Sequence, residues 1–198
     1  MILLEGNTFF QKLLQADYWL MLKINRDWQS PMLDNMTLFI REASFWVPLY
    51  VFLLLFITLN FGKKGWWWAL ALIGLVALSD LLSSHLIKEM LFRPRPCRDE
   101  VMAHKIRFIA KTCGLNGSFT SSHATNHFAI ASFAYTTLKN SSSYWSLAFV
   151  WAGMISYAQV YVGVHYPFDI IGGAILGSTL GYFTASLFNH QMGLGLVK

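Results

Sequence analysis

Three short polar stretches interrupt an otherwise apolar chain, and their residue types could together perform phosphoryl chemistry. They are KEMLFRPRP at 88–96, SFTSSHA at 118–124 and VGVHYPFD at 162–169. Together they hold basic side chains, hydroxyl groups, two histidines and one carboxylate. Cations and hydroxyls can hold a phosphate, and a histidine can attack its phosphorus atom. Because each stretch lies at the end of a hydrophobic segment, we expect this chemistry at a membrane surface.

The third stretch contains a histidine and an aspartate at the spacing of a nucleophile and its orienting group. Pro167 suits the first turn of a helix, because its missing N–H would have no intrahelical partner there. His165 would then lie just before the helix and Asp169 one turn inside it. The carboxylate could accept the proton of one imidazole nitrogen and leave the other free to attack. The alternative is a purely structural pair that stabilises the helix N-terminus.

The second stretch predicts a helix N-terminus that binds an anion. Ser121 or Ser122 can cap this helix, and the unpaired amide groups of such an end bind phosphate readily. His123 would project from the same end, where it could protonate a departing oxygen and later deprotonate water. His127 follows four residues later, which raises the alternative of a metal site. No HExxH pattern or acidic cluster accompanies the pair, so we predict no metal or cofactor. We assign His127 to helix packing or to the support of site residues.

The first stretch supplies cations. Lys88 is expected to end a helix, and Pro94 and Pro96 stiffen the following segment so that Arg95 is presented in a fixed geometry. Arginine grips phosphate through a planar fork, whereas lysine acts as a movable point charge. The alternative is that these long side chains only reach from the membrane towards water.

The rest of the chain predicts an all-α protein that crosses a membrane. Of its 198 residues, 55% are hydrophobic and 13% charged, against about 25% charged in a soluble domain. Five apolar runs approach the roughly 20 residues that a spanning helix needs: 43–62, 65–79 continuing towards 88, 124–138, 144–162 and 170–188. We predict an integral membrane bundle of five transmembrane helices, or six if residues 9–24 also span. Successive spans alternate in direction, so the three polar stretches should meet on one side.

The N-terminal region differs from the bundle. Residues 9–24 mix apolar side chains with Lys12, Asp17 and Lys23, a pattern typical of an amphipathic helix at the membrane interface. A second amphipathic stretch follows Pro31. We therefore predict one domain, 1–198, with an amphipathic N-terminal region at 1–41 and the bundle that carries the site at 43–198.

Two regular patterns predict contacts between helices rather than chemistry. Asp80, Ser84 and Lys88 recur every four residues on one helix face, which suggests a polar contact that supports the lysine indirectly. A row of small residues at the same interval lets a neighbouring helix approach closely: Gly173, Gly177 and Gly181.

The three stretches resemble the signature of the type 2 phosphatidic acid phosphatase superfamily, which includes lipid phosphate phosphatases. Its pattern is Lys, six residues, Arg-Pro; then Pro-Ser-Gly-His; then Ser-Arg, five residues, His, three residues, Asp. The matching positions are Lys88, Arg95, Pro96, Ser121, His123, His165 and Asp169. The resemblance implies that His165 is a nucleophile forming a phosphohistidine, that Asp169 orients it and that His123 is the general acid and base. It also implies phosphate binding by the cations and serine, without a metal.

The chain departs from this pattern at several positions. Thr120 and Ser122 replace the family's proline and glycine, and we keep Ser122 among the phosphate-binding residues. Ala158 and Gln159 stand where the family has Ser-Arg, so Gln159 replaces the arginine. Its amide can still donate hydrogen bonds to a phosphoryl oxygen, but neutral hydrogen bonds are about half as strong. We expect weaker activity or a different head group, unless Arg93 or Arg98 compensates.

The connection between the second and third spans carries most of the topological information. It is rich in basic residues, which by the positive-inside rule favours the cytoplasm, whereas the family resemblance implies the outer face. Cys97 and Cys113 both lie in it. They are equally compatible with two free thiols and with a disulfide, and a disulfide would favour the outer face. We predict a bacterial inner (cytoplasmic) membrane protein whose active site faces the periplasm.

These expectations combine into a metal-independent phosphatase that acts on a phosphomonoester or pyrophosphate head group. Its partner would be a membrane lipid and not a nucleic acid; the candidates are undecaprenyl pyrophosphate, phosphatidic acid, phosphatidylglycerol phosphate and a lipid A phosphate. The alternative is an anionic-lipid binding or transport protein that has lost turnover. Vanadate-dependent haloperoxidases have a similar pocket, but those relatives are soluble.

Overall fold

A computed structural model describes residues 9–195, and within that range every regular element is helical. The predicted all-α fold is therefore confirmed, while residues 1–8 and 196–198 of the predicted domain lie outside the described residues. The main helices are α1 (Phe9–Leu22), α2 (Pro31–Ile40), α3 (Val47–Asp80), α4 (Lys88–Met90), α5 (Ser122–Leu138), α6 (Leu147–Tyr161) and α7 (Pro167–Gln191). Two π-helical segments, Lys23–Asp27 and Leu81–Ile87, continue α1 and α3.

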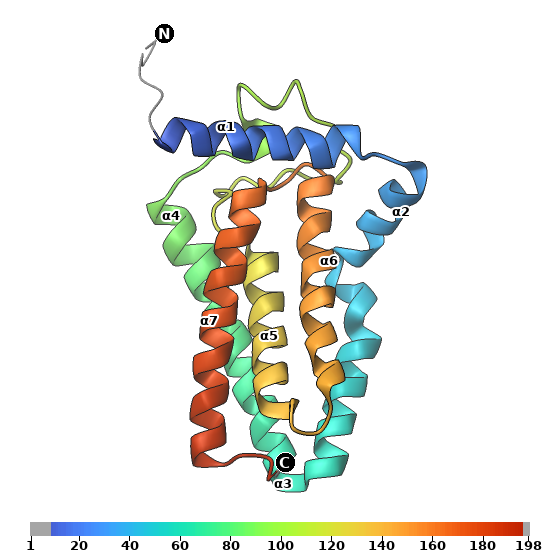
Figure 1. The fold of residues 1–198 in the computed structure, drawn as a ribbon, viewed down its shortest axis with the longest axis vertical. Coiled ribbons are helices and arrows are strands. Elements are labelled where there is room, and N and C mark those ends of the chain that lie inside the picture. The colour runs from blue at the N-terminus through green and yellow to red at the C-terminus, as the bar shows by residue number, and fades with distance from the viewer. Residues whose placement is uncertain (1–8, 196–198) are drawn as a thin grey trace.

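Helix α3 contains both of the first two apolar runs and folds back on itself. Gly62 has φ 52°, in the left-handed region that favours glycine, and it breaks the helix into two arms. Figure 1 shows the first arm running down from α2 and the second rising towards α4. The arms touch at Gly65, where a Cβ atom would lie 2.3 Å from the carbonyl oxygen of Ile57.

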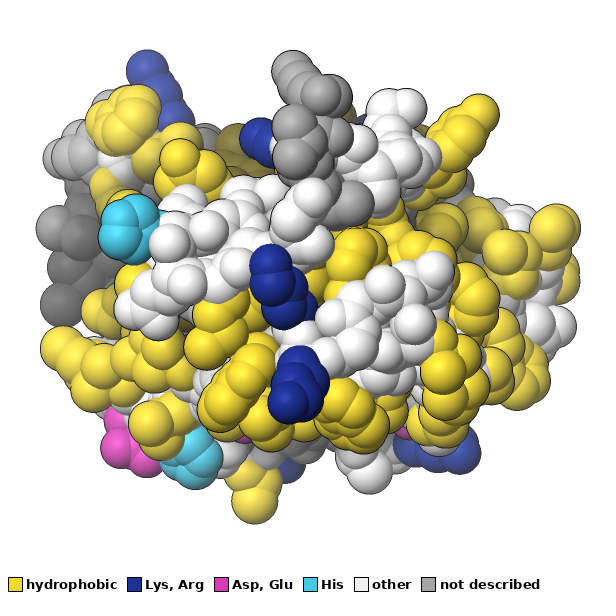
Figure 2. All heavy atoms as spheres, turned by 90° about the horizontal axis from the view of Figure 1, so that it is seen from below, with side chains coloured by type: hydrophobic (Ala, Val, Ile, Leu, Met, Phe, Trp, Pro, Cys, Tyr) yellow, Lys and Arg dark blue, Asp and Glu magenta, His cyan; other side chains and the backbone are white. Residues whose placement is uncertain are grey.

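Two helical stretches, Ala43–Met90 and Pro167–Gln191, are long and apolar enough to cross a membrane, and the first contains both arms of α3. Helices α5 and α6 are shorter, with 17 and 15 residues. The number of transmembrane helices, five to six, therefore stays a prediction. Large apolar side chains are exposed along α3 and α7, including Leu59, Ile73 and Phe183. Seen from below, the end of the bundle shows hydrophobic groups interleaved with uncharged ones, and basic side chains near its centre (Figure 2). Extended exposed apolar surface is typical of contact with lipid or protein.

Helix α5 lies among α3, α6 and α7 and is the most buried helix of the bundle (Figure 1). The predicted glycine row packs α7 directly onto it. A Cβ on Gly177 would lie 2.1 Å from the carbonyl oxygen of Thr125, and one on Gly181 would lie 2.4 Å from that of Ala129. This close packing sets the first turn of α7 against the first turn of α5, where two of the polar stretches end.

Adding a methyl group at this contact should destabilise the fold. We expect Gly177→Ala to lower the free energy of unfolding by about 1–3 kcal/mol, the usual cost of overpacking, and to lower the Tm in detergent. Gly153→Ala in α6 is the matched control, because its Cβ would meet no atom within 4 Å and alanine favours the helix. A Gly177→Ala variant as stable as Gly153→Ala would contradict the close packing.

The N-terminal helices cover one end of the bundle. Helix α1 lies across this end, with α2 beside α6 (Figure 1). The predicted amphipathic helix is present, but Asp17 is 1% exposed and faces the protein, whereas Phe9 and Trp19 are exposed. Asp34 fixes α2, because it accepts hydrogen bonds from the Tyr161 hydroxyl and from Arg107, both at 2.6 Å.

Candidate active site

The three polar stretches meet at the end of the bundle beneath α1. Lys88 Nζ donates to Ser122 Oγ at 2.6 Å, which joins α4 to the start of α5. Arg95 Nη1 lies 3.2 Å from His165 Nε2, which joins the segment after α4 to the loop before α7. The convergence predicted from alternating spans is therefore present in the structure.

The start of α7 sets the geometry of the histidine and the aspartate. Pro167 occupies the first turn as predicted, and Asp169 Oδ2 accepts a hydrogen bond from the backbone N–H of Tyr166 at 2.8 Å. The same oxygen lies 3.5 Å from His165 Nδ1. A guanidinium can only donate, so the hydrogen bond from Arg95 requires His165 Nε2 to be unprotonated. The imidazole proton then resides on Nδ1 and points towards Asp169.

Electrostatics favours the neutral form of this histidine. His165 is 2% exposed. Burial lowers its pKa to about 4, an effect that the neighbouring Asp169 carboxylate only partly opposes. Its Nε2 lone pair is therefore available at neutral pH. Burial also lowers the pKa of Arg95, although a guanidinium remains protonated at any physiological pH.

Asp169 has further partners that the sequence reasoning missed. Its Oδ1 accepts from Arg93 Nη1 at 2.8 Å, and its Oδ2 accepts from the hydroxyl of Ser118. Arg93 also donates to Asp17 Oδ2 at 2.5 Å, and the other oxygen of Asp17 accepts from the Phe168 N–H at 2.9 Å. Although burial opposes it, the two carboxylates raise the pKa of Arg93. This network ties α1 to the start of α7.

The expectation that Arg93 or Arg98 compensates for the missing family arginine finds no support in these contacts. The Arg93 guanidinium is committed to two carboxylates. Arg98 donates to the backbone carbonyl of Cys113 at 3.2 Å, at an exposed position.

Ser121 and Ser122 begin α5 in different roles. Ser121 is its N-cap, and its Oγ accepts from the Ala124 N–H at 3.4 Å. Ser122 occupies the first turn, so the contact with Lys88 lies at the N-terminus of α5. A helix N-terminus of this kind attracts anions.

The predicted polar contact along one helix face is a directed chain of hydrogen bonds. Ser84 donates to Asp80 Oδ1 at 3.0 Å and lies 2.7 Å from Ser122 Oγ. Because the Ser84 proton is directed at Asp80, Ser122 must donate to Ser84, which leaves its Oγ to accept from Lys88. Asp80 thus orients Lys88 through two hydroxyls, as the spacing suggested.

The two histidines of α5 have different surroundings. The ring nitrogens of His127 lie 2.7 Å from the His123 carbonyl oxygen and 3.4 Å from the Tyr50 hydroxyl. Its ring also packs edge-on against Trp151, so His127 makes packing contacts inside the bundle. Within the described residues, the imidazole of His123 makes no hydrogen bond, and it is only partly buried. It is therefore available for proton transfer with a ligand.

Gln159 is fully buried, at 0% exposure. Its Oε1 accepts from Arg41 at 3.4 Å from Nε and 3.3 Å from Nη2. Its Nε2 has no hydrogen-bond partner in residues 9–195. The sequence placed Gln159 among the phosphate-binding residues, but nothing in the local pattern indicated Arg41.

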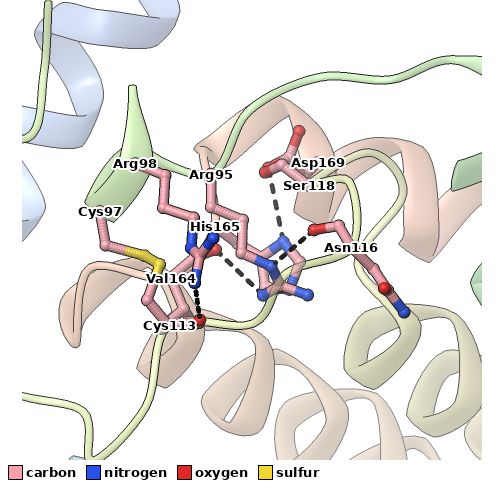
Figure 3. Close-up of a disulfide and its surroundings, with 9 residues drawn as sticks. All are labelled: Arg95, Cys97, Arg98, Cys113, Asn116, Ser118, Val164, His165 and Asp169. Atoms are coloured by element: carbon pink, nitrogen blue, oxygen red, sulfur yellow. Dashed lines mark hydrogen bonds and ion pairs between the residues drawn. A yellow bond between two sulfur atoms is a disulfide. The ribbon is translucent and has the colours of Figure 1, made fainter. Parts of the chain in front are cut away.

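A disulfide closes the loop that follows Arg95. Cys97 and Cys113 are bonded, with their Cα atoms 6.2 Å apart, so of the two alternatives the structure contains the disulfide. Figure 3 shows this bond beside Arg95 and His165. Arg95 also donates to the carbonyl oxygens of Asn116 and Val164, at 3.1 and 3.3 Å. In the chain-entropy model a crosslink of this length stabilises by about 3 kcal/mol.

Comparison with known proteins identifies the family. Residues 64–192 match the PAP2 superfamily. The lipid A 4'-phosphatase of Porphyromonas gingivalis is 30% identical over 164 residues, which cover 81% of this chain and 68% of that protein. The undecaprenyl-diphosphatase BcrC of Bacillus subtilis is 26% identical over 151 residues, 76% of this chain and 72% of that protein.

A solved structure has the same fold. The transmembrane PAP2-type phosphatidylglycerolphosphate phosphatase from Bacillus subtilis superposes with a TM-score of 0.67 at 23% identity, over 95% of this chain and 89% of that chain. The segment that matches the family, residues 64–192, contains all three polar stretches. This chain therefore belongs to the PAP2 superfamily, as its polar stretches predicted, and is an integral membrane protein.

Proposed function

We propose that this chain hydrolyses a phosphomonoester or pyrophosphate on a membrane lipid and releases inorganic phosphate. The observation that carries the proposal is the state of His165. Its unprotonated Nε2 faces Arg95 at 3.2 Å, while its Nδ1 faces Asp169 at 3.5 Å. A buried neutral imidazole, oriented by a carboxylate and set beside a cation, is suited to attack on an anionic phosphorus centre.

In the first step, the Nε2 electron pair of His165 forms a bond to phosphorus while the bond from phosphorus to the leaving oxygen breaks. His123, which takes up a proton once the anionic phosphate lies beside it, transfers that proton to the leaving oxygen. The negative charge of the phosphoryl oxygens is offset by Lys88, by Arg95 and by the amide groups at the start of α5. Ser121 caps this helix, and Ser122 lies beside Lys88. The product is a phosphohistidine and a dephosphorylated lipid.

In the second step, water attacks the phosphorus of the phosphohistidine and gives a proton to His123. The bond between phosphorus and nitrogen breaks, and its electron pair returns to His165 Nε2. Asp169 stabilises the imidazole throughout, because it faces the protonated Nδ1. Inorganic phosphate leaves and the starting protonation states are restored.

The lipid part of the substrate has a place to bind beside this chemistry. A cavity of about 700 Å³ lies between the two arms of α3 and α5. Its walls are mainly apolar, and its polar end is formed by Asp80, Asn126 and His127. Asp80 is connected to Ser122 through Ser84, so the cavity approaches the phosphate site. An acyl or prenyl chain fits such an apolar cavity while the head group reaches the cations.

The disulfide supports a site on the periplasmic face. Structural disulfides persist in oxidising compartments and are rare in the cytoplasm. The basic residues that would argue for the cytoplasmic face include Lys88, Arg93 and Arg95, whose contacts lie within the site. Cations retained for binding are poor markers of topology.

The proposal is tested by phosphate release from a panel of lipids in the presence of EDTA. The panel comprises lipid A phosphate, undecaprenyl pyrophosphate, phosphatidylglycerol phosphate and phosphatidic acid. Because the attacking and proton-transferring groups are side chains, we expect purified protein in detergent to release phosphate equally well with and without EDTA. Rapid quenching with radiolabelled substrate should trap label on a histidine.

Each other outcome has a definite meaning. Activity that EDTA abolishes and added divalent metal restores would contradict the metal-independent mechanism. Binding without release from any lipid in the panel would favour the alternative of a lipid-binding or transport protein.

A further inference from the structure

Arg41, at the C-terminal end of α2, is a mostly buried cation whose hydrogen bonds go to a single neutral oxygen. Its side chain is 15% exposed, and both Nε and Nη2 donate to Gln159 Oε1. Glu42 lies 3.8 Å from Nη1 but is 56% exposed, and such a contact with an exposed carboxylate contributes little. Within the described residues, Nη1 donates no hydrogen bond. The guanidinium therefore retains free donors.

The buried and partly buried basic side chains fall into two groups according to their hydrogen-bond partners. Arg93 and Arg107 bond directly to aspartates, as expected for cations that hold helices together. Lys88, Arg95 and Arg41 instead direct their hydrogen bonds at neutral groups: a hydroxyl, two carbonyls with an imidazole, and an amide. Buried cations without a bonded counter-ion are unfavourable unless a ligand supplies the negative charge. Arg41 belongs to the second group, whose positive charges a bound anion would neutralise.

Arg41 is also close to the groups assigned to the reaction. After burial, the positive charge of Arg41 is among those that oppose protonation of His123. After burial, the charges of Arg41 and Arg98 further lower the pKa of Arg95. The Arg41 charge therefore interacts with both His123 and Arg95, and its hydrogen bonds to Gln159 place it beside the loop that carries His165.

Gln159 fixes Arg41 relative to the nucleophile. The Gln159 side chain holds the guanidinium. The Gln159 backbone carbonyl accepts hydrogen bonds from the N–H groups of Val164 and His165, at 3.1 and 3.3 Å. One buried residue thus anchors both Arg41 and the loop that carries His165. A change in its side chain would shift the cation without breaking that backbone contact.

We propose that Arg41 binds the phosphoryl group that is transferred, and that Gln159 is a positioning residue for it. The proposal rests on the proposed phosphatase function and extends it. With Lys88 and Arg95, Arg41 brings a third cation to the site, which suits a doubly charged phosphoryl group. Arg41 lies before the segment 64–192 that matches the family, so binding of the head group depends on the N-terminal region of this chain.

The test compares variants of the purified protein in two assays: hydrolysis of the best lipid substrate and the rise in Tm caused by inorganic phosphate. We expect Arg41→Ala to lower kcat/KM by about 100-fold, as for loss of one donor to a transition-state oxyanion, and to reduce the rise in Tm. Arg26→Ala is the matched control, an exposed arginine of the same region, and should stay within about twofold of wild type.

A second variant separates binding from folding. Arg41→Ala with Gln159→Arg returns a guanidinium to the same place from α6, and should recover about tenfold of the lost kcat/KM because the charge-assisted contact is restored. Failure of this rescue together with an unchanged Arg41→Ala response to phosphate would overturn the inference. If wild type is stabilised by phosphate in an Arg41-dependent way but hydrolyses no lipid, the proposed function fails while the binding role of Arg41 stands. Equal stabilisation of wild type and Arg41→Ala by phosphate overturns that role.

Discussion

Replacing His165 with alanine is expected to reduce phosphate release by about 10⁴-fold or more, the scale of losing a catalytic nucleophile. The reason is that His165 Nε2 faces Arg95 at 3.2 Å, while the imidazole proton is directed towards Asp169. The measurement is the initial rate of phosphate release from the best lipid of the panel. The label trapped on histidine in rapid-quench experiments should disappear in the same variant.

The control is a histidine outside the site. His190 is exposed on α7, so His190→Ala should keep its activity within about twofold of wild type. Because His165 is buried, the Tm of His165→Ala must also be measured, and activity compared well below it. A folded His165→Ala variant with more than a tenth of wild-type activity would rule out His165 as the nucleophile. In that case the partly buried His123 would become the first residue to examine.

Local sequence patterns predicted much of the site because several of its contacts arise within a few residues. A proline at the first turn of a helix, a serine cap and an i, i+4 pair each follow from helix geometry alone. For this reason the positions of Pro167 and Asp169, the cap at Ser121 and the link from Asp80 to Lys88 agree with expectation. The glycine row of α7 is a similar case, because its spacing alone marks one face of the helix.

The contacts that could not be predicted join residues far apart in the chain. Arg41 and Gln159 are separated by 118 positions, and Asp17 and Arg93 by 76. An amphipathic pattern shows that α1 has two unlike faces, but not which face meets the protein. The amphipathic pattern puts Asp17 on the polar face of the helix, whereas the structure buries it against Arg93. The direction in which a helix presents its polar residues depends on tertiary packing, which residue spacing does not encode.

Replacing Asp169 with asparagine is expected to lower kcat by about 10³-fold while KM changes little. Asp169 faces His165, the proposed nucleophile, so its loss should affect reaction rather than binding. An asparagine can turn its NH₂ group towards His165 Nδ1, which would move the imidazole proton to Nε2 and block attack. The readout is therefore the separate change in kcat and KM for the best lipid substrate.

A second buried aspartate provides the control for this variant. Asp99 is 8% exposed and accepts from the hydroxyls of Tyr18 and Tyr166, at 3.3 and 2.8 Å. Asp99→Asn should lower the Tm, because it weakens charge-assisted hydrogen bonds, yet leave kcat within a few-fold of wild type. Equal loss of kcat in both variants would mean that Asp169 supports the fold rather than the histidine. A selective loss in Asp169→Asn would instead show that the carboxylate acts on the reaction through His165, since the two substitutions remove the same charge from the same end of the bundle.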